Sequence, residues 1–278
     1  MNLPDFVIIG AMKAATTSLH YYLNLHPQIS MSKEKELNFF VKERNWGKGL
    51  DWYKSNFNGE KPFRGEASPN YTNFPLFKGV PERMHSVVPD IKLIYLVRDP
   101  IERILSQYVH KVADGGESRS LEKALSRFTA NRYICRSQYF MQLEHYLKVF
   151  PDEKILVVSS EDLINNNRAV IKCVFEFLNV DSSFYHDKFV NILHKSSRKR
   201  RKSQTAQFLR RKSVMRNIDN LPYSFRSYID WLVFWPFSRN VNRPVLSETL
   251  KQRIIDYLRD DIEQLRRFTG HKYSEWCL

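Results

Sequence analysis

The sequence is poor in cysteine and glycine and contains no long apolar run. Its three cysteines, Cys135, Cys173 and Cys277, have neither metal-ligand nor disulfide spacing. No apolar stretch approaches the length that crosses a bilayer, and the first residues lack a signal-peptide pattern. These absences argue against a disulfide framework, a bound metal and a membrane span. They favour a reduced, cytoplasmic protein.

The positive charge of the chain is unevenly distributed. The formal net charge is +14, and the stretch from Lys195 to Lys212 contains nine Lys or Arg residues and no acid. Such a local basic run indicates an anionic ligand or surface close to it. A nucleic-acid-binding module would interleave aromatic residues with the basic ones, whereas this run contains only Phe208. We therefore expect no nucleic-acid partner.

The first strand-to-helix unit lies at residues 6–25. Four apolar residues, Phe6 to Ile9, precede Gly10 and predict a buried parallel strand. Apolar residues then recur at helical spacing from Leu19 until Pro27 stops the pattern. A helix N-terminus directly after a strand offers backbone N–H groups and a positive dipole end to an anion. The sequence therefore predicts a phosphate or sulfate site here.

A second unit of the same kind begins with the apolar strand Ile91 to Val97. Arg98 follows at once, Asp99 is a good N-cap, and Pro100 is a good first helical residue, so we expect a helix to about Val112. Ligands of open parallel sheets lie beyond the carboxyl ends of the strands. Lys13 and Arg98 both fall at such ends.

The remaining pattern alternates strands with helices. Strands are expected at 64–67 and 154–160, and helices at 47–57, 81–88, 121–133, 139–150, 167–178 and 247–269. This alternation predicts an α/β fold, a central and mainly parallel sheet flanked by helices in three layers. Since there is no repeat and no low-complexity linker, we predict one domain over 1–278.

The phosphate loop does not match that of a nucleotide triphosphatase or P-loop kinase. That pattern requires G-x-x-x-x-G-K followed by Ser or Thr. Here Lys13 comes too early and the second glycine is missing, with Ala14 and Ala15 before Thr16. Asp99 is the only residue that imitates a magnesium-binding carboxylate.

Two motifs resemble those of sulfotransferases that use 3′-phosphoadenylyl sulfate (PAPS). The stretch Lys13–Leu19 resembles their 5′-phosphosulfate loop, usually K-x-G-T-T-x-L, and the segment 98–108 resembles their 3′-phosphate signature. Glu36–Phe40 and Gly49–Tyr53 are similar to the heparan-sulfate-type branch and its bacterial relatives. The matches are in the expected order and run from residue 6 to about 180.

The resemblance implies a P-loop-like fold and sulfuryl transfer from PAPS to a hydroxyl or amine, with adenosine 3′,5′-bisphosphate as product and no metal. It implies a nucleotide-binding core at about 5–180, followed by a basic loop, an aromatic segment and a C-terminal helix at 194–278. We expect a small-molecule or natural-product acceptor, with a saccharide as the alternative. The aromatic segment 231–237 is expected to line the acceptor pocket, to mediate a homodimer or to belong to the core.

The resemblance also implies which residues bind the donor. They are the loop residues Lys13, Ala14, Ala15, Thr16, Thr17 and Ser18, the 3′-phosphate ligands Arg98 and Ser106, and the basic-loop residues Arg198, Lys199 and Arg200. Arg98 would form a bidentate contact with phosphate, which guanidinium does better than ammonium. The alternatives without ligand binding are helix capping for the loop hydroxyls, a solvent-exposed surface hydroxyl for Ser106 and solvated charges for the basic loop.

Three side chains are candidates for the transfer step itself. Glu36 would act as general base, screened from water by Phe39 and Phe40, although spacing alone favours a surface glutamate. Lys13 would offset charge on the leaving phosphate, and Lys35 would hold the sulfuryl oxygens. His110, one helical turn beyond Ser106, is the rival base, although a lone helix histidine is usually structural.

The chain departs from the family pattern at two positions. Ala15 occupies the place of the common loop glycine, and a methyl group is tolerable there if the backbone keeps a negative φ. Ala67 replaces the lysine that related glycan-modifying members tend to carry between Glu66 and Ser68. The loss of this charge, together with the lack of an apolar stretch that could anchor the chain in a membrane, is the reason for expecting a small-molecule acceptor.

Overall fold

The computed structural model describes residues 3–57, 59–190, 200–202, 238–240 and 243–278. The chain divides into two compact units. The first comprises residues 1–104, 125–193 and 247–278, and the second comprises residues 105–124 and 194–246. The prediction of a single domain stays a prediction.

The first unit is built on a five-stranded parallel sheet in the order β2-β3-β1-β4-β5. The strands are β1 (Phe6–Gly10), β2 (Ile29–Met31), β3 (Phe63–Ala67), β4 (Lys92–Val97) and β5 (Ile155–Ser159). β1 is the central strand and β4 pairs with it, and the apolar side chains of both are buried, which is why both are apolar runs in the sequence. The edge strand β2 was not predicted, since it has only three residues.

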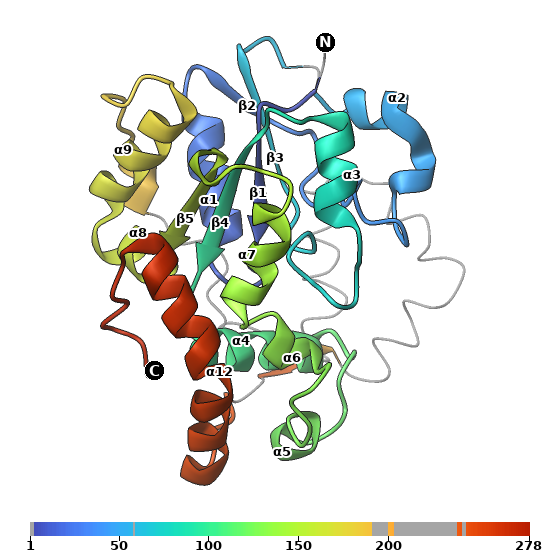
Figure 1. Cartoon of the computed structure of the whole chain (residues 1–278), viewed down its shortest axis with the longest axis vertical. Coiled ribbons are helices and arrows are strands. Elements are labelled where there is room, and N and C mark those ends of the chain that lie inside the picture. Colours follow the sequence, from blue (N-terminus) through green and yellow to red (C-terminus); the bar gives the residue numbers. More distant parts are fainter. Residues whose placement is uncertain (1–2, 58, 191–199, 203–237, 241–242) are drawn as a thin grey trace. The chain divides into compact units, whose positions relative to one another are not determined.

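Helices cover both faces of this sheet. Those of the first unit are α1 (Thr16–Leu25), α2 (Gly49–Lys54), α3 (Val80–Val87), α6 (Arg132–Cys135), α7 (Tyr139–Leu147), α8 (Ser160–Asn165), α9 (Asn167–Leu178) and α12 (Glu248–Thr269), with 3₁₀ turns η1 (Trp46–Lys48), η2 (Asp152–Lys154) and η3 (Asp187–Val190). Figure 1 shows α1 and α9 on one side of the strands and α3, α7 and α12 on the other. The predicted three-layer α/β arrangement is confirmed.

The second unit contains little regular structure among the described residues. It holds most of α4 (Pro100–Ala113), α5 (Leu121–Ala124) and an antiparallel pair of β6 (Arg200–Lys202) with β7 (Ser238–Asn240). The predicted start of α4 is confirmed, because Asp99 Oδ1 accepts a hydrogen bond from the backbone N–H of Glu102 at 2.8 Å.

One predicted helix, 121–133, is wrong. The structure has the short helices α5 and α6 with a non-helical segment between them. Ala130 lies in the left-handed region (φ 55°), and the Asn131 side chain accepts from the backbone N–H of Tyr133 to start α6 afresh. The apolar periodicity of residues 121–133 fitted one continuous helix, but the Asn131 cap starts a separate helix within it.

Candidate active site

The phosphate loop connects the end of β1 to the start of α1. Gly10 is required at the strand end, because a Cβ there would lie 1.9 Å from Thr72 Oγ1. The chain then turns through Lys13 (φ 74°) and Ala15 (φ 62°), so the negative φ that would make a methyl group tolerable at Ala15 is not met. Ala15, the N-cap residue of α1, forms no side-chain capping hydrogen bond, so among the described residues the structure does not show the helix-capping alternative for the loop hydroxyls. The loop therefore presents an uncapped helix N-terminus, the local geometry that favours an anion.

Arg98 brings the two predicted motifs together. Its Nη1 donates to the carbonyl oxygen of Lys13 at 3.3 Å, and its Nη2 forms an ion pair with Glu102 at 3.1 Å. The Tyr139 hydroxyl donates to the Arg98 carbonyl at 2.6 Å and fixes the backbone from which this side chain starts. Lys13 and Arg98 are thus neighbours at the carboxyl ends of β1 and β4, as the sequence predicted.

Two further guanidinium groups lie buried against the same loop. Arg103 Nη1 donates to the Met12 carbonyl at 3.5 Å, and Arg136 Nη1 contacts the Met12 sulfur. Arg136 also donates to the side-chain oxygens of Asn70 and Asn73, at 2.9 and 2.7 Å. Several cations thus surround the loop.

Arg136 is the residue of this group that sequence reasoning missed. Its side chain is only 7% exposed, and it forms no ion pair with any residue that the structure describes. Burial first, and then nearby Arg103, lower the pKa of Arg136 to about 9. A buried cation without an ion-pair partner is costly, and the nearby Glu36 carboxylate offsets only part of the effect of burial on the pKa, so this position favours an anionic ligand. Arg136 gave no sequence signal, because it directly follows the four-residue helix α6 and belongs to no recognisable motif.

Glu36 lies on a loop beside the carboxyl end of β3. Its backbone N–H donates to the Ala67 carbonyl at 2.9 Å, and its Oε1 pairs with Lys35 Nζ at 3.0 Å. The Glu36 side chain is 48% exposed, whereas Phe39 and Phe40 are buried and pack on Tyr53. Phe39 and Phe40 therefore do not screen the Glu36 side chain from water in this structure, contrary to the expectation from the sequence.

The loop that carries Glu36 is held by a buried carboxyl group, Glu66 of β3, which the sequence did not reveal. Glu66 is fully buried and accepts hydrogen bonds from the hydroxyls of Tyr53 (3.1 Å), Tyr71 (2.7 Å) and Ser68 (3.3 Å). Ser68 Oγ in turn accepts from the backbone N–H of Asn38 at 3.0 Å. Burial raises the pKa of Glu66 to about 7 despite these three donors.

The other predicted site residues belong to the second unit. Ser106 and His110 both lie on α4, and His110 Nε2 is 3.2 Å from Asp114 Oδ2. Arg200 is the first residue of β6, whereas Arg198, Lys199 and the aromatic segment 231–237 lie outside the described residues. Their assignment to the donor and acceptor sites stays a prediction.

The comparisons with known proteins identify the family. Residues 3–223 match the sulfotransferase domain family. The chain belongs to that family. It is 33% identical over 194 residues to human heparan sulfate glucosamine 3-O-sulfotransferase 5, covering 64% of this chain and 54% of the relative. It is 30% identical over 200 residues to human bifunctional heparan sulfate N-deacetylase/N-sulfotransferase 2, covering 64% of this chain and 22% of that protein.

A solved bacterial structure has the same fold as this sulfotransferase-family chain. The sulfotransferase from Alicyclobacillus acidocaldarius aligns with a TM-score of 0.72 at 22% identity, over 99% of each chain. The agreement is one of fold. The curated relatives are longer proteins, since this chain spans about half or less of their length.

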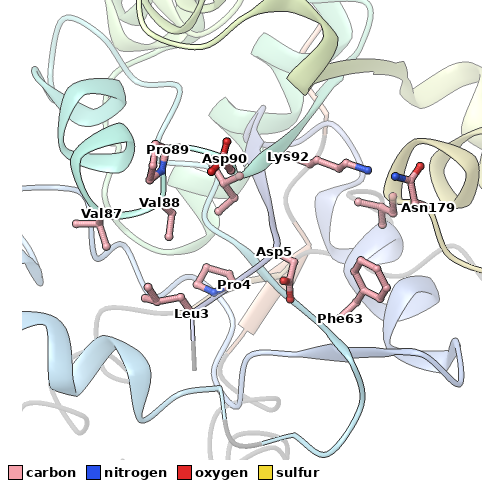
Figure 2. A pocket seen from close by; sticks show the side chains of 12 residues that line it. Leu3, Pro4, Asp5, Phe63, Val87, Val88, Pro89, Asp90, Lys92 and Asn179 are labelled. Carbon is pink, nitrogen blue, oxygen red and sulfur yellow. The ribbon is translucent and has the colours of Figure 1, made fainter. Parts of the chain in front are cut away.

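A cavity of about 450 Å³ lies away from the phosphate loop of this family member. Figure 2 shows its lining, which includes Asp5, Phe63 and Lys92, residues at the amino ends of β1, β3 and β4. Because the sheet is parallel, this cavity and the phosphate loop lie at opposite edges of it. The cavity is thus no part of the candidate active site.

Among the described residues, no helix combines the length and the apolar composition that a membrane span requires. Within the same residues, no group of three or more His, Cys, Asp or Glu side chains is arranged to hold a metal ion.

Proposed function

We propose that this chain transfers the sulfuryl group of PAPS to a hydroxyl or amine of a saccharide acceptor and releases adenosine 3′,5′-bisphosphate. The observation that carries the proposal is the contact of Arg98 with the Lys13 carbonyl, which joins the two phosphate motifs. The uncapped start of α1 and the buried Arg136 suit a ligand with several negative charges.

Each candidate residue has a defined part in the proposed reaction. The acceptor oxygen or nitrogen forms a bond to sulfur while the bond from sulfur to the 5′-phosphate oxygen breaks. Glu36 takes the proton of the acceptor, and Lys13 offsets the charge that develops on the departing phosphate. Arg98 and Ser106 bind the 3′-phosphate, and His110 is the alternative base.

The names of the relatives favour the saccharide over the small molecule that the sequence favoured. Both curated relatives are named as heparan sulfate enzymes. The absence of a lysine at position 67 had favoured a small molecule over a saccharide. In the structure the Ala67 side chain is buried in β3. A small-molecule acceptor and a cytoplasmic location therefore stay predictions.

The deciding experiment supplies labelled PAPS with one acceptor preparation per reaction. The arms are a desulfated heparan-type polysaccharide, a native small-molecule extract and no acceptor. Label on the polysaccharide is expected, whereas label confined to the extract would replace the saccharide by a small molecule. Calorimetric titration with adenosine 3′,5′-bisphosphate runs in parallel. No label in any arm together with no nucleotide binding would contradict the proposed activity altogether.

A further inference from the structure

The C-terminal tail, residues 271–278, lies against the segment that carries Arg98. The backbone N–H of Cys277 donates to Asp99 Oδ2 at 2.7 Å, and the indole N–H of Trp276 donates to Glu161 Oε2 at 3.3 Å. Glu161 Oε1 accepts from the backbone N–H of Asp99 at 3.0 Å. The tail therefore contacts Asp99 directly and also through Glu161.

Asp99 is buried and is contacted from both sides. It is 3% exposed, and each of its carboxylate oxygens accepts one backbone N–H, from Glu102 inside α4 and from Cys277 in the tail. The first bond caps the helix, and the second orients the same carboxylate from outside it. The residue directly after Arg98 is thus fixed by a segment almost 180 positions away.

Aromatic packing supports the same segment. The Trp276 ring is 5.8 Å from that of Tyr139 and stacks on Tyr273 at 4.2 Å. Tyr139 donates its hydroxyl hydrogen to the Arg98 carbonyl at 2.6 Å. Trp276 and Tyr273 are only 6% and 3% exposed. Tail and Tyr139 together hold the backbone on both sides of the bond between Arg98 and Asp99.

We propose that Trp276 and Cys277 are positioning residues for the 3′-phosphate of the donor nucleotide, acting through Asp99 and Glu161 on Arg98. The inference rests on the proposed function, because it takes Arg98 as the 3′-phosphate ligand. A guanidinium reaches two phosphate oxygens only when its backbone is held at the right distance and angle, so a loosened tail weakens this contact selectively.

The test compares two nucleotides that differ in the 3′-phosphate alone, adenosine 3′,5′-bisphosphate and adenosine 5′-phosphate. Cys277→Pro removes the N–H that donates to Asp99, and Trp276→Phe removes the indole donor but keeps an aromatic ring. Loss of the hydrogen bonds that the tail donates to the Asp99 or Glu161 carboxylate should weaken bisphosphate binding about tenfold and monophosphate binding less than about twofold. Glu275→Ala, in the same tail, is the matched control, because the exposed Glu275 side chain accepts long hydrogen bonds of 3.4 Å from Asn165.

A second comparison separates positioning from general stability. In an Arg98→Ala background, Cys277→Pro and Trp276→Phe should produce no further selective loss of bisphosphate binding. Equal losses for both nucleotides, no loss, or a selective loss that persists without Arg98 would each overturn the tail's role. The unmutated chain reports on the proposed function independently, since it should prefer the bisphosphate. If it shows no such preference, Arg98 is no 3′-phosphate ligand, and the proposed donor site fails together with the inference.

Discussion

Ala15 has the backbone conformation of a glycine but carries a methyl group. Its φ of 62° lies in the left-handed region, where a side chain costs roughly 1–2 kcal/mol. Glycine would remove this cost but adds about 0.5–1 kcal/mol of chain entropy. The two effects leave a net gain for glycine at this position.

Ala15→Gly should therefore raise the free energy of unfolding by about 0.5–1 kcal/mol. Urea unfolding followed by far-UV circular dichroism measures this change. Ala14→Gly is the matched control, since Ala14 is buried and has no positive φ, and glycine there should destabilise the chain. A loss of stability in Ala15→Gly would show that the methyl group contributes more by packing than its backbone costs.

Glu36 is the proposed general base of the transfer step. We expect Glu36→Gln to lower the rate of sulfuryl transfer by about a hundredfold or more, because a positioned general base contributes 10²–10⁴. Binding of adenosine 3′,5′-bisphosphate should stay close to that of the unmutated chain. Single-turnover transfer and calorimetry measure the two quantities. Glu34→Gln, an exposed neighbour in the same charged run, is the control. Retained turnover would assign the base to His110 or another group.

At the scale of elements, the loop 36–40 depends on a chain of directed hydrogen bonds. Ser68 has one hydroxyl proton, which it gives to Glu66, so its oxygen lone pairs are available to the Asn38 N–H. Glu36 and Asn38 both have positive φ, at 64° and 49°, and the Asn38 side chain donates to the Glu36 carbonyl. Backbone in this region persists only where its surroundings hold it.

Removal of the Ser68 hydroxyl should release this loop. Ser68→Ala leaves the buried Asn38 N–H without an acceptor, which costs about 1–3 kcal/mol of unfolding free energy. The rate of transfer should fall more than donor affinity does. The released loop contains the proposed base Glu36, whereas the donor is bound by the separate phosphate loop. Ser86→Ala, which removes an exposed hydroxyl bonded to Arg83, serves as control. An unchanged transfer rate in a destabilised Ser68→Ala would show that the network supports folding alone.

The sequence predicted those elements whose signals are local. β1, β4 and α9 appeared as apolar runs or helical periodicity, and α12 starts at the Ser247 cap and ends at Gly270 as expected. Lys13 and Arg98 were predictable for the same reason, since each directly follows a strand. Glu66 and Arg136 were not, because their burial depends on partners far away in the chain, such as Tyr53 and Met12.

At the scale of the whole molecule, buried titratable groups pull stability in opposite directions with pH. Burial raises the pKa of Glu66 and that of Asp261 to about 7, although Asp261 accepts backbone N–H bonds from Phe140 and Met141. Burial and, to a lesser extent, nearby Lys35 lower the pKa of His20 to about 4. The acids therefore favour folding at low pH and the histidine favours folding at neutral pH. Because these effects have opposite signs, the pH dependence of the unfolding free energy of the unmutated chain does not isolate the contribution of any one group.

The contribution of Glu66 is best measured as a difference between two chains. Its folded pKa of about 7 lies above the unfolded value near 4.5, so the folded state binds its proton more tightly. The stability it supplies is present below pH ~4.5 and is lost as pH rises to ~7, a change of about 3 kcal/mol. Glu66→Gln cannot titrate.

Across the same window, the unfolding free energy of Glu66→Gln should therefore rise relative to the unmutated chain. Urea titrations at several pH values between 4.5 and 8 measure this difference, with exposed Glu34→Gln as the control for loss of a charge. A difference that does not change with pH would mean that the three hydroxyl donors outweigh burial and keep Glu66 ionised. In that case the Ser68 hydroxyl would donate to an ionised Glu66 throughout this pH range. The hydrogen bonds that position the Glu36 loop would then be independent of pH.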